Sequence, residues 1–168
     1  EESLIVGVYV DDLQVGYDHD DEFSLYASFV NAMKDRWSVD DEGELADLLG
    51  VEFSRDGSDV ILTQTAYIER LVTEHCPDGV PTKQQTNRTP CDSDLVQAVA
   101  DALACSDVRD ATATKRYQSI VGALLYCATH TRPDVAYAVG MLCRCMAMVT
   151  PELEAAAQRV LHYLYVTR

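Results

Sequence analysis

The N-terminal part of the chain alternates apolar and polar positions in a way that predicts a tight β-hairpin. Residues 4–10 (Leu-Ile-Val-Gly-Val-Tyr-Val) are apolar and rich in β-forming side chains, and residues 13–16 alternate behind them. Asp11 and Asp12 stand between these segments, at the expected tip, because aspartate is a poor strand former and is common in turns. Such a pair is typical of a solvated turn, although two carboxylates on a rigid hairpin also suit magnesium.

The next segments predict a helix and a second hairpin. Apolar residues recur at helical spacing over about 21–37, which predicts a helix there. Segments 48–53 and 60–64 favour strands joined by a turn at 55–58. We expect Thr65 to cap a short helix that follows the second strand.

The second half of the chain is predicted to be all-helical. Residues 95–104 and 114–128 favour helices, a further helix is expected to start near Pro133, and Thr150-Pro151 marks the start of the last one. Periodicity disappears over 77–94, which predicts a linker or a surface loop. The fold class is therefore α+β, with β-hairpins and a helix in front and a helical bundle behind.

Composition narrows the class of protein. The chain has 168 residues, of which 48% are hydrophobic, so we expect one domain or two small ones with a packed core. No apolar run approaches the roughly 20 residues of a membrane span. Residues 1–3 contain no basic residue, so we expect no signal peptide. The six cysteines form no C-x-x-C pair, which favours free intracellular thiols.

Charge is unevenly distributed along the chain. The formal net charge is −15, and residues 1–59 hold 17 acids against three basic residues, a local charge of −14. The remaining residues hold 11 acids and 10 basic residues, a charge of −1. An acidic surface argues against a protein that grips phosphate backbones by itself.

An ordered series of motifs resembles a known family. The series comprises Tyr9-Val10-Asp11-Asp12, Gly43-Glu44-Leu45, Leu49-Gly50-Val51-Glu52, Leu62–Ile68, Thr89-Pro90, Tyr117–Tyr126 and Thr131–Val139. In order and spacing it is similar to the reverse transcriptase of copia-type LTR retrotransposons, from the catalytic hairpin of the palm through the thumb and connection. The resemblance covers nearly the whole chain. It implies a partial palm over 1–76, a linker over 77–94 and a helical thumb and connection over 95–168.

The resemblance implies roles for the first hairpin. Polymerases of this kind use two Mg²⁺ ions to activate the primer 3′-hydroxyl and to neutralise the triphosphate. In the family the first acid of the hairpin is a metal ligand and the second supports the site, which implies that Asp11 and Asp12 are catalytic and metal-binding. Tyr9 and Val10 would then lie near the primer terminus, or be plain strand residues.

The second hairpin resembles the primer grip, whose backbone steers the primer end. Leu49 and Gly50 would make this contact, and Leu48 stands where the family usually has an aromatic residue. Gly50 would permit close backbone approach. The alternative is a hairpin that only packs on the palm.

Three residues of the 114–128 segment share one predicted helix face. Gln118, Gly122 and Tyr126 are spaced at i, i+4 and i+8. A glycine inside a helix costs about 1 kcal/mol relative to alanine, so it needs a reason. The family implies that this face tracks the minor groove of the template–primer duplex. The alternative reason is a close helix–helix crossing at Gly122.

Basic residues near the ends of this helix are weaker candidates. Lys115, Arg116 and Arg132 could contact phosphates, although each one alone is more typical of a solvated charge. His130 and His162 are interpreted as surface or boundary residues rather than metal ligands.

The chain departs from the family pattern at two lysine positions. They read Asp40 and Ala46 here, so the lysine that would protonate the leaving pyrophosphate is missing. The fingers and the first half of the palm, with the other metal-binding aspartate, are also not in this sequence. We therefore expect this polypeptide alone to be inactive.

Together these features predict a fragment of an RNA-directed DNA polymerase. The implied partners are Mg²⁺, deoxynucleoside triphosphates, an RNA or DNA template–primer duplex and the rest of a retrotransposon polyprotein, with no membrane. The parent element implies an intracellular location, in a cytoplasmic particle and the nucleus. The alternatives are a decayed or domesticated interaction module without catalysis, and an unrelated acidic α+β protein.

Overall fold

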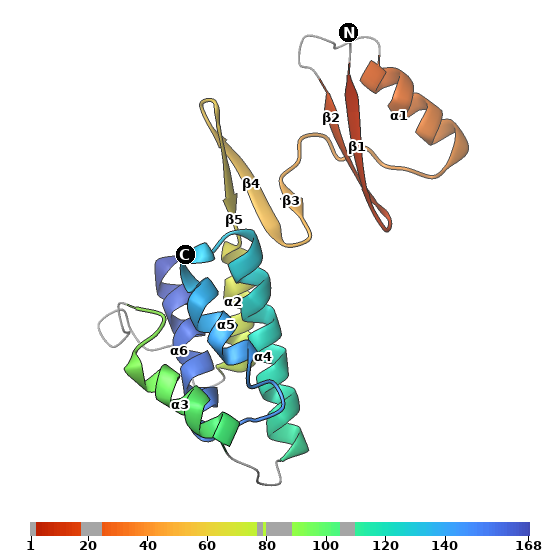
Figure 1. Cartoon of the computed structure of the whole chain (residues 1–168). Coiled ribbons are helices and arrows are strands. Elements are labelled where there is room, and N and C mark those ends of the chain that lie inside the picture. The colour runs from red at the N-terminus through yellow and green to blue at the C-terminus, as the bar shows by residue number, and fades with distance from the viewer. Residues whose placement is uncertain (1–2, 18–24, 77–78, 80–88, 105–109) are drawn as a thin grey trace. The chain divides into compact units, whose positions relative to one another are not determined.

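The computed structural model describes residues 3–17, 25–76, 79, 89–104 and 110–168 (Figure 1). Two small antiparallel sheets occur early in the chain and a packed bundle of helices follows, which confirms the α+β class. By packing, the chain divides into two compact units, Glu1–Ala46 and Asp47–Arg168. The predicted palm, linker and thumb boundaries are a separate, functional division and stay a prediction. Most of the predicted linker lies outside the described residues.

The first unit begins with the predicted hairpin. Strands β1 (Leu4–Tyr9) and β2 (Asp12–Tyr17) are antiparallel, and the last residue of β1, Tyr9, pairs with the first of β2, Asp12. The two-residue turn is therefore Val10-Asp11, and the expectation that both aspartates form the tip is corrected. Asp12 belongs to the strand because its backbone still pairs with Tyr9.

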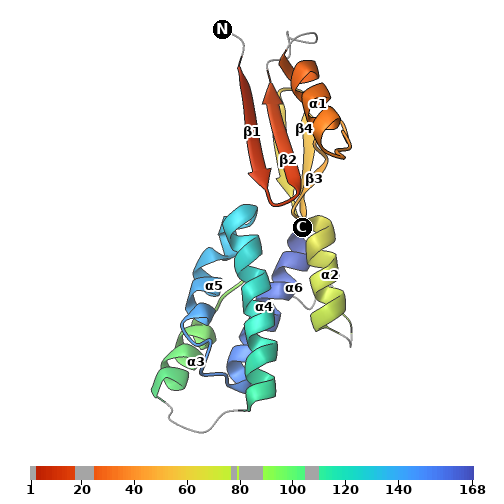
Figure 2. The same ribbon diagram turned by 90° about the vertical axis from the view of Figure 1, so that its right-hand side faces the viewer.

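Helix α1 (Leu25–Arg36) lies beside this hairpin in both views (Figures 1 and 2). It confirms the predicted helix over the described part of 21–37, since residues 21–24 lie outside it. The rings of Tyr17 and Tyr26 stack with centroids 4.4 Å apart, and the Tyr26 hydroxyl donates to Asp41 at 3.1 Å. None of the described residues of this unit is buried.

The second unit opens with a three-stranded antiparallel sheet. The strands are β3 (Asp47–Leu48), β4 (Val51–Asp56) and β5 (Asp59–Thr63), in that order. The predicted second hairpin is confirmed as β4–β5, with a turn at Gly57-Ser58. Strand β3 was not predicted, because two residues are too short for a periodic pattern to show.

In the described part of the second unit, five α-helices follow the sheet. They are α2 (Thr65–His75), α3 (Ser93–Ala104), α4 (Ala111–His130), α5 (Ala136–Cys143) and α6 (Pro151–Thr167). The start predicted near Pro133 is instead a 3₁₀ turn, Pro133–Val135, and α5 begins after it. Thr150 caps α6 as predicted, its side chain accepting from the Leu153 N–H.

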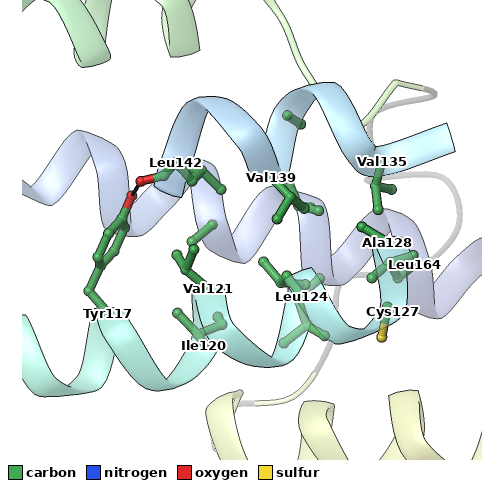
Figure 3. Packing of buried hydrophobic residues seen from close by; sticks show 14 of the residues in the cluster. Tyr117, Ile120, Val121, Leu124, Cys127, Ala128, Val135, Val139, Leu142 and Leu164 are labelled. Atoms are coloured by element: carbon green, nitrogen blue, oxygen red, sulfur yellow. Dashed lines mark hydrogen bonds between the residues drawn. The ribbon is translucent and has the colours of Figure 1, made fainter. Parts of the chain in front are cut away.

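Helix α6 is the centre of the bundle. It packs against α2, α3, α4 and α5, and its buried stripe is Leu153, Ala157, Val160, Leu161 and Leu164. Figure 3 shows α4 and α5 contributing facing apolar side chains, with the buried Tyr117 hydroxyl donating to the Leu142 carbonyl at 2.9 Å. This core fixes the orientation of α4 and leaves its opposite face exposed.

Candidate nucleic-acid interface

The candidate site of the first unit is the tip of the β1–β2 hairpin. Val10 has φ +52°, so a β-branched residue occupies the left-handed region that favours glycine. Tyr9, Val10, Asp11 and Asp12 are all exposed. Asp11 in the turn and Asp12 at the start of β2 therefore present two adjacent carboxylates to solvent.

Two carboxylates alone could supply only part of a cation site. Oxygen ligands from aspartate match the preference of Mg²⁺. Within the described residues, however, no group of three or more histidine, cysteine, aspartate or glutamate side chains could hold a metal. The donor set at Asp11 and Asp12 therefore fits magnesium chemically, and further ligands would have to come from outside the described residues.

The second unit has its own candidate site, and the first part of it is the β3–β4 turn. Leu49 and Gly50 both have positive φ, +57° and +79°, as in a type I′ turn between the paired Leu48 and Val51. A Cβ at Gly50 would lie 3.6 Å from Cδ2 of Tyr67, an ordinary contact. Glycine at this position is therefore explained by the backbone angle.

The other part of the candidate site in the second unit is the exposed face of α4. Gln118 and Gly122 are exposed and Tyr126 is half-buried, so the three predicted residues share the face that the bundle leaves open. A Cβ at Gly122 would meet nothing within 4 Å among the described residues. A close helix–helix crossing at Gly122, the alternative left open by the sequence, is therefore wrong for the described part of the chain.

Both polar side chains beside Gly122 are bound within the protein. The Gln118 Nε2 donates to the Met146 carbonyl at 3.0 Å, and the Tyr126 hydroxyl donates to the Leu49 carbonyl at 2.7 Å. The structure thus joins two residues that the sequence placed in separate parts of the site. Tyr126 binds the β3–β4 turn directly.

The basic residues predicted as phosphate contacts differ from one another. Arg116 pairs with Glu154, Nη2 to Oε1, at 2.6 Å, and this hydrogen bond raises the pKa of its guanidinium. Arg132 forms two hydrogen bonds to Asp134, at 2.9 and 2.7 Å, and lowers the pKa of that carboxyl. Lys115 has no ion pair among the described residues. Two of the three cations are therefore already neutralised by acids.

Glu52 has a role that sequence reasoning missed. Its carboxylate accepts from the Thr63 hydroxyl at 2.7 Å and from the N–H groups of Thr65 and Ala66 at 2.9 and 3.2 Å. It therefore caps α2 from the neighbouring strand, and the predicted capping by Thr65 is wrong, since Thr65 lies inside the helix. The only signal in sequence is that Glu52 and Thr63 fall opposite each other once the register is known.

The histidines and cysteines do not add a further site. His162 is half-buried, as expected, and burial lowers its pKa; its Nε2 lies 3.5 Å from Sγ of Cys76. Cys76, Cys91, Cys127 and Cys143 are free thiols, in agreement with the prediction, while Cys105 lies outside the described residues. Among the helices that the structure describes, none has the length and apolar character needed to cross a bilayer.

Comparison with known proteins reveals relatives encoded by transposons. The chain is 31% identical over 98% of its length to a transposon Ty5-1 protein of Saccharomyces cerevisiae. It is 34% identical over 94% of its length to a retrovirus-related Pol polyprotein from transposon RE1 of Arabidopsis thaliana. An uncharacterized mitochondrial protein of the same plant is 29% identical over 94% of the chain.

The match covers only part of these relatives. The chain spans 50% of the Ty5-1 protein, 10% of the RE1 polyprotein and 59% of the mitochondrial protein. No protein-family model matches the chain, and no solved structure matches it. Over nearly its whole length, the chain is homologous to Pol polyproteins of transposons.

Proposed function

We propose that this chain is part of the reverse transcriptase of a copia-type retrotransposon, an RNA-directed DNA polymerase. It would comprise the C-terminal part of the palm, the thumb and the start of the connection. The observation that carries the proposal is the Asp11-Asp12 hairpin, which presents two exposed carboxylates in a chain homologous to transposon Pol polyproteins. The open face of α4 at Gly122 supports it, because that glycine has no packing role among the described residues.

In this proposal the chain positions groups and does not complete the active site. Asp11 and Asp12 would hold Mg²⁺, which when bound supplies charge neutralisation for in-line nucleotidyl transfer. The β3–β4 turn, with Leu49 and Gly50, would guide the primer end. The remaining carboxylates and the cations that clamp the triphosphate would belong to the rest of the polyprotein, so the isolated chain is expected to be inactive.

The face of α4 would track the template–primer duplex. The minor groove of an A-form duplex is wide and shallow, and a helix with a glycine at its centre can approach the sugar edges closely. Gly122 would provide this approach and Gln118 would flank it. The polymerase would act in a cytoplasmic particle and the nucleus.

The first experiment measures duplex binding by the chain itself. Fluorescence anisotropy with a labelled RNA–DNA primer–template would compare wild type, Gly122→Leu and the matched control Gly140→Leu, which changes another helical glycine with open space around it. We expect Gly122→Leu to weaken binding about tenfold and Gly140→Leu to leave it unchanged. Equal affinities for all three proteins would contradict a duplex-tracking role for α4.

The second experiment measures primer extension by the full Pol open reading frame. Asp11→Asn should abolish extension, because a neutral amide binds Mg²⁺ poorly, whereas Asp56→Asn in the sheet of the second unit should not. If the wild-type full-length protein shows no extension, the polymerase proposal fails.

A second candidate function is a decayed or domesticated interaction module without catalysis. The observation that favours it is charge: the net charge is −15, Arg116 and Arg132 pair with acids, and Asp40 and Ala46 replace the lysines that the family pattern would supply. A full-length protein that binds the duplex without extending the primer would support this candidate.

A further inference from the structure

Tyr126 connects two segments of the second unit that are far apart in sequence. Its hydroxyl, on α4, donates a 2.7 Å hydrogen bond to the backbone carbonyl of Leu49, 77 positions earlier. The Tyr126 ring lies edge-on to Tyr67 on α2, with centroids 5.2 Å apart, and 4.1 Å from the His130 ring. Packing against Tyr67 and His130 therefore fixes the Tyr126 ring, and the hydroxyl on this ring binds the Leu49 carbonyl.

The β3–β4 turn, which accepts this hydrogen bond, has weak local stabilisation. Leu49 is in a left-handed conformation with φ +57°, which a bulky side chain rarely adopts, and 45% of its surface is exposed. Strand β3 contributes only two residue pairs, Asp47 with Glu52 and Leu48 with Val51. The local bond from the Gly50 N–H to Asp47 is long, at 3.4 Å.

Tyr67 supports the same turn from α2. Its ring lies next to Gly50, and the guanidinium of Arg70 covers that ring at 5.2 Å from the centroid. The turn therefore rests on two tyrosines from two helices. One of these helices, α4, also carries Gln118, eight residues before Tyr126 on the same face.

We propose that Tyr126 is a positioning residue, which fixes the Leu49-Gly50 turn on the exposed face of α4. The turn backbone and the Gln118–Gly122 face then form one rigid surface for the duplex; this second step rests on the proposed function. The Tyr126 hydroxyl already donates its proton to the Leu49 carbonyl. Tyr126 therefore acts on the primer end through the turn and not by direct contact.

The first test needs no nucleic acid. Amide hydrogen exchange of Val51, which closes the turn opposite Leu48, is measured in the 168-residue chain for wild type and Tyr126→Phe. Losing one hydrogen bond should speed exchange at Val51 about fivefold. Tyr137→Phe, at an exposed tyrosine of α5, is the matched control and should change nothing there. Unchanged exchange at Val51 in Tyr126→Phe overturns the proposal.

A rescue experiment separates positioning from general stability. Leu49→Asn creates Asn-Gly, the pair that type I′ turns prefer, and keeps the backbone carbonyl. In the Leu49→Asn background we expect Tyr126→Phe to have at most a twofold effect on Val51 exchange. A merely structural Tyr126 would instead speed exchange in the α4 and α6 core, with no rescue, and that outcome also overturns the proposal.

Binding of an RNA–DNA primer–template then links the turn to the duplex. Tyr126→Phe should weaken binding about threefold, and Leu49→Asn combined with Tyr126→Phe should restore it. Weakened binding without rescue would assign the hydroxyl to direct duplex contact and overturn the positioning role. If the wild-type chain binds no duplex, the proposed function fails, while the exchange experiment still decides whether Tyr126 fixes the turn.

Discussion

Val10 and Leu49 are the two non-glycine residues with positive φ among the described residues. Each lies in a two-residue turn, and each turn belongs to the candidate site of its own unit. Burial of the side chain does not offset the strained backbone at either residue, since 81% of the Val10 surface and 45% of the Leu49 surface are exposed. Backbone conformations of this kind persist at functional sites, where geometry matters more than local stability.

Replacing Val10 by glycine tests whether the backbone of this turn is strained. Glycine tolerates the φ of +52° that costs valine about 1–2 kcal/mol, although part of the gain is lost to unfolded-chain entropy. We expect amide exchange at Asp12, which pairs with Tyr9, to slow about threefold. Faster exchange at Asp12 would show that Val10 is not strained.

Glu52 makes stability depend on pH. Its hydrogen bond from Thr63, and those from the Ala66 and Thr65 N–H groups, lower its pKa from the ordinary 4.5. A carboxyl with a depressed folded-state pKa stabilises the fold above its unfolded pKa and loses that contribution as pH falls through the folded value. As pH falls from 7 to 3, the wild type should therefore lose this contribution to its stability. The Glu52→Gln variant does not have the contribution at any pH.

The size of this effect follows from the cap. Urea unfolding at pH 7 should show Glu52→Gln less stable by about 1 kcal/mol, as for loss of a helix cap. The difference should narrow toward pH 3. Glu44→Gln, at an exposed glutamate outside this arrangement, is the control and should match wild type. A difference that is constant from pH 7 to pH 3 would contradict the role of the ionised carboxylate.

Among the elements, those with a local signal were predictable from sequence. Both hairpins, α1, α4 and α6 follow from strand alternation, helical periodicity and capping residues within a few positions of one another. The cap of α2 by Glu52 and the bond from Tyr126 to Leu49 were not predictable. Each depends on a partner brought near by strand register or helix packing, which no local pattern encodes.

The glycine in α4 gives an element-scale prediction. A Cβ at Gly122 meets nothing within 4 Å of the described residues, so Gly122→Ala should raise the free energy of unfolding by about 1 kcal/mol through helix propensity alone. Urea denaturation followed by circular dichroism measures it. Gly140→Ala, in the same class of environment on α5, should give a similar gain. Destabilisation by Gly122→Ala would reveal a close contact at this face.

For the whole molecule, charge and burial are distributed in opposite ways. Residues 1–59 carry 17 acids and three basic residues, while the buried hydrophobic core lies in the second unit, formed mainly by α2 to α6. The first unit has no buried side chain among its described residues. A hairpin and one helix without a core are marginally stable at best. The apolar area that they bury is too small to offset the loss of conformational entropy on folding.

Dissecting the chain tests this division. A fragment of residues 47–168 should unfold cooperatively in urea, with a free energy of unfolding within about 1 kcal/mol of that of the full chain. The reason is that the described residues of the first unit add no buried apolar side chain. A fragment of residues 1–46 should show no cooperative transition by circular dichroism. In the full Pol protein the same hairpin should gain protection from exchange, because the proposed polymerase places further palm residues next to it. Cooperative unfolding of the 1–46 fragment would show that this unit is stable without a partner, and would remove the reason to expect the rest of a palm around Asp11.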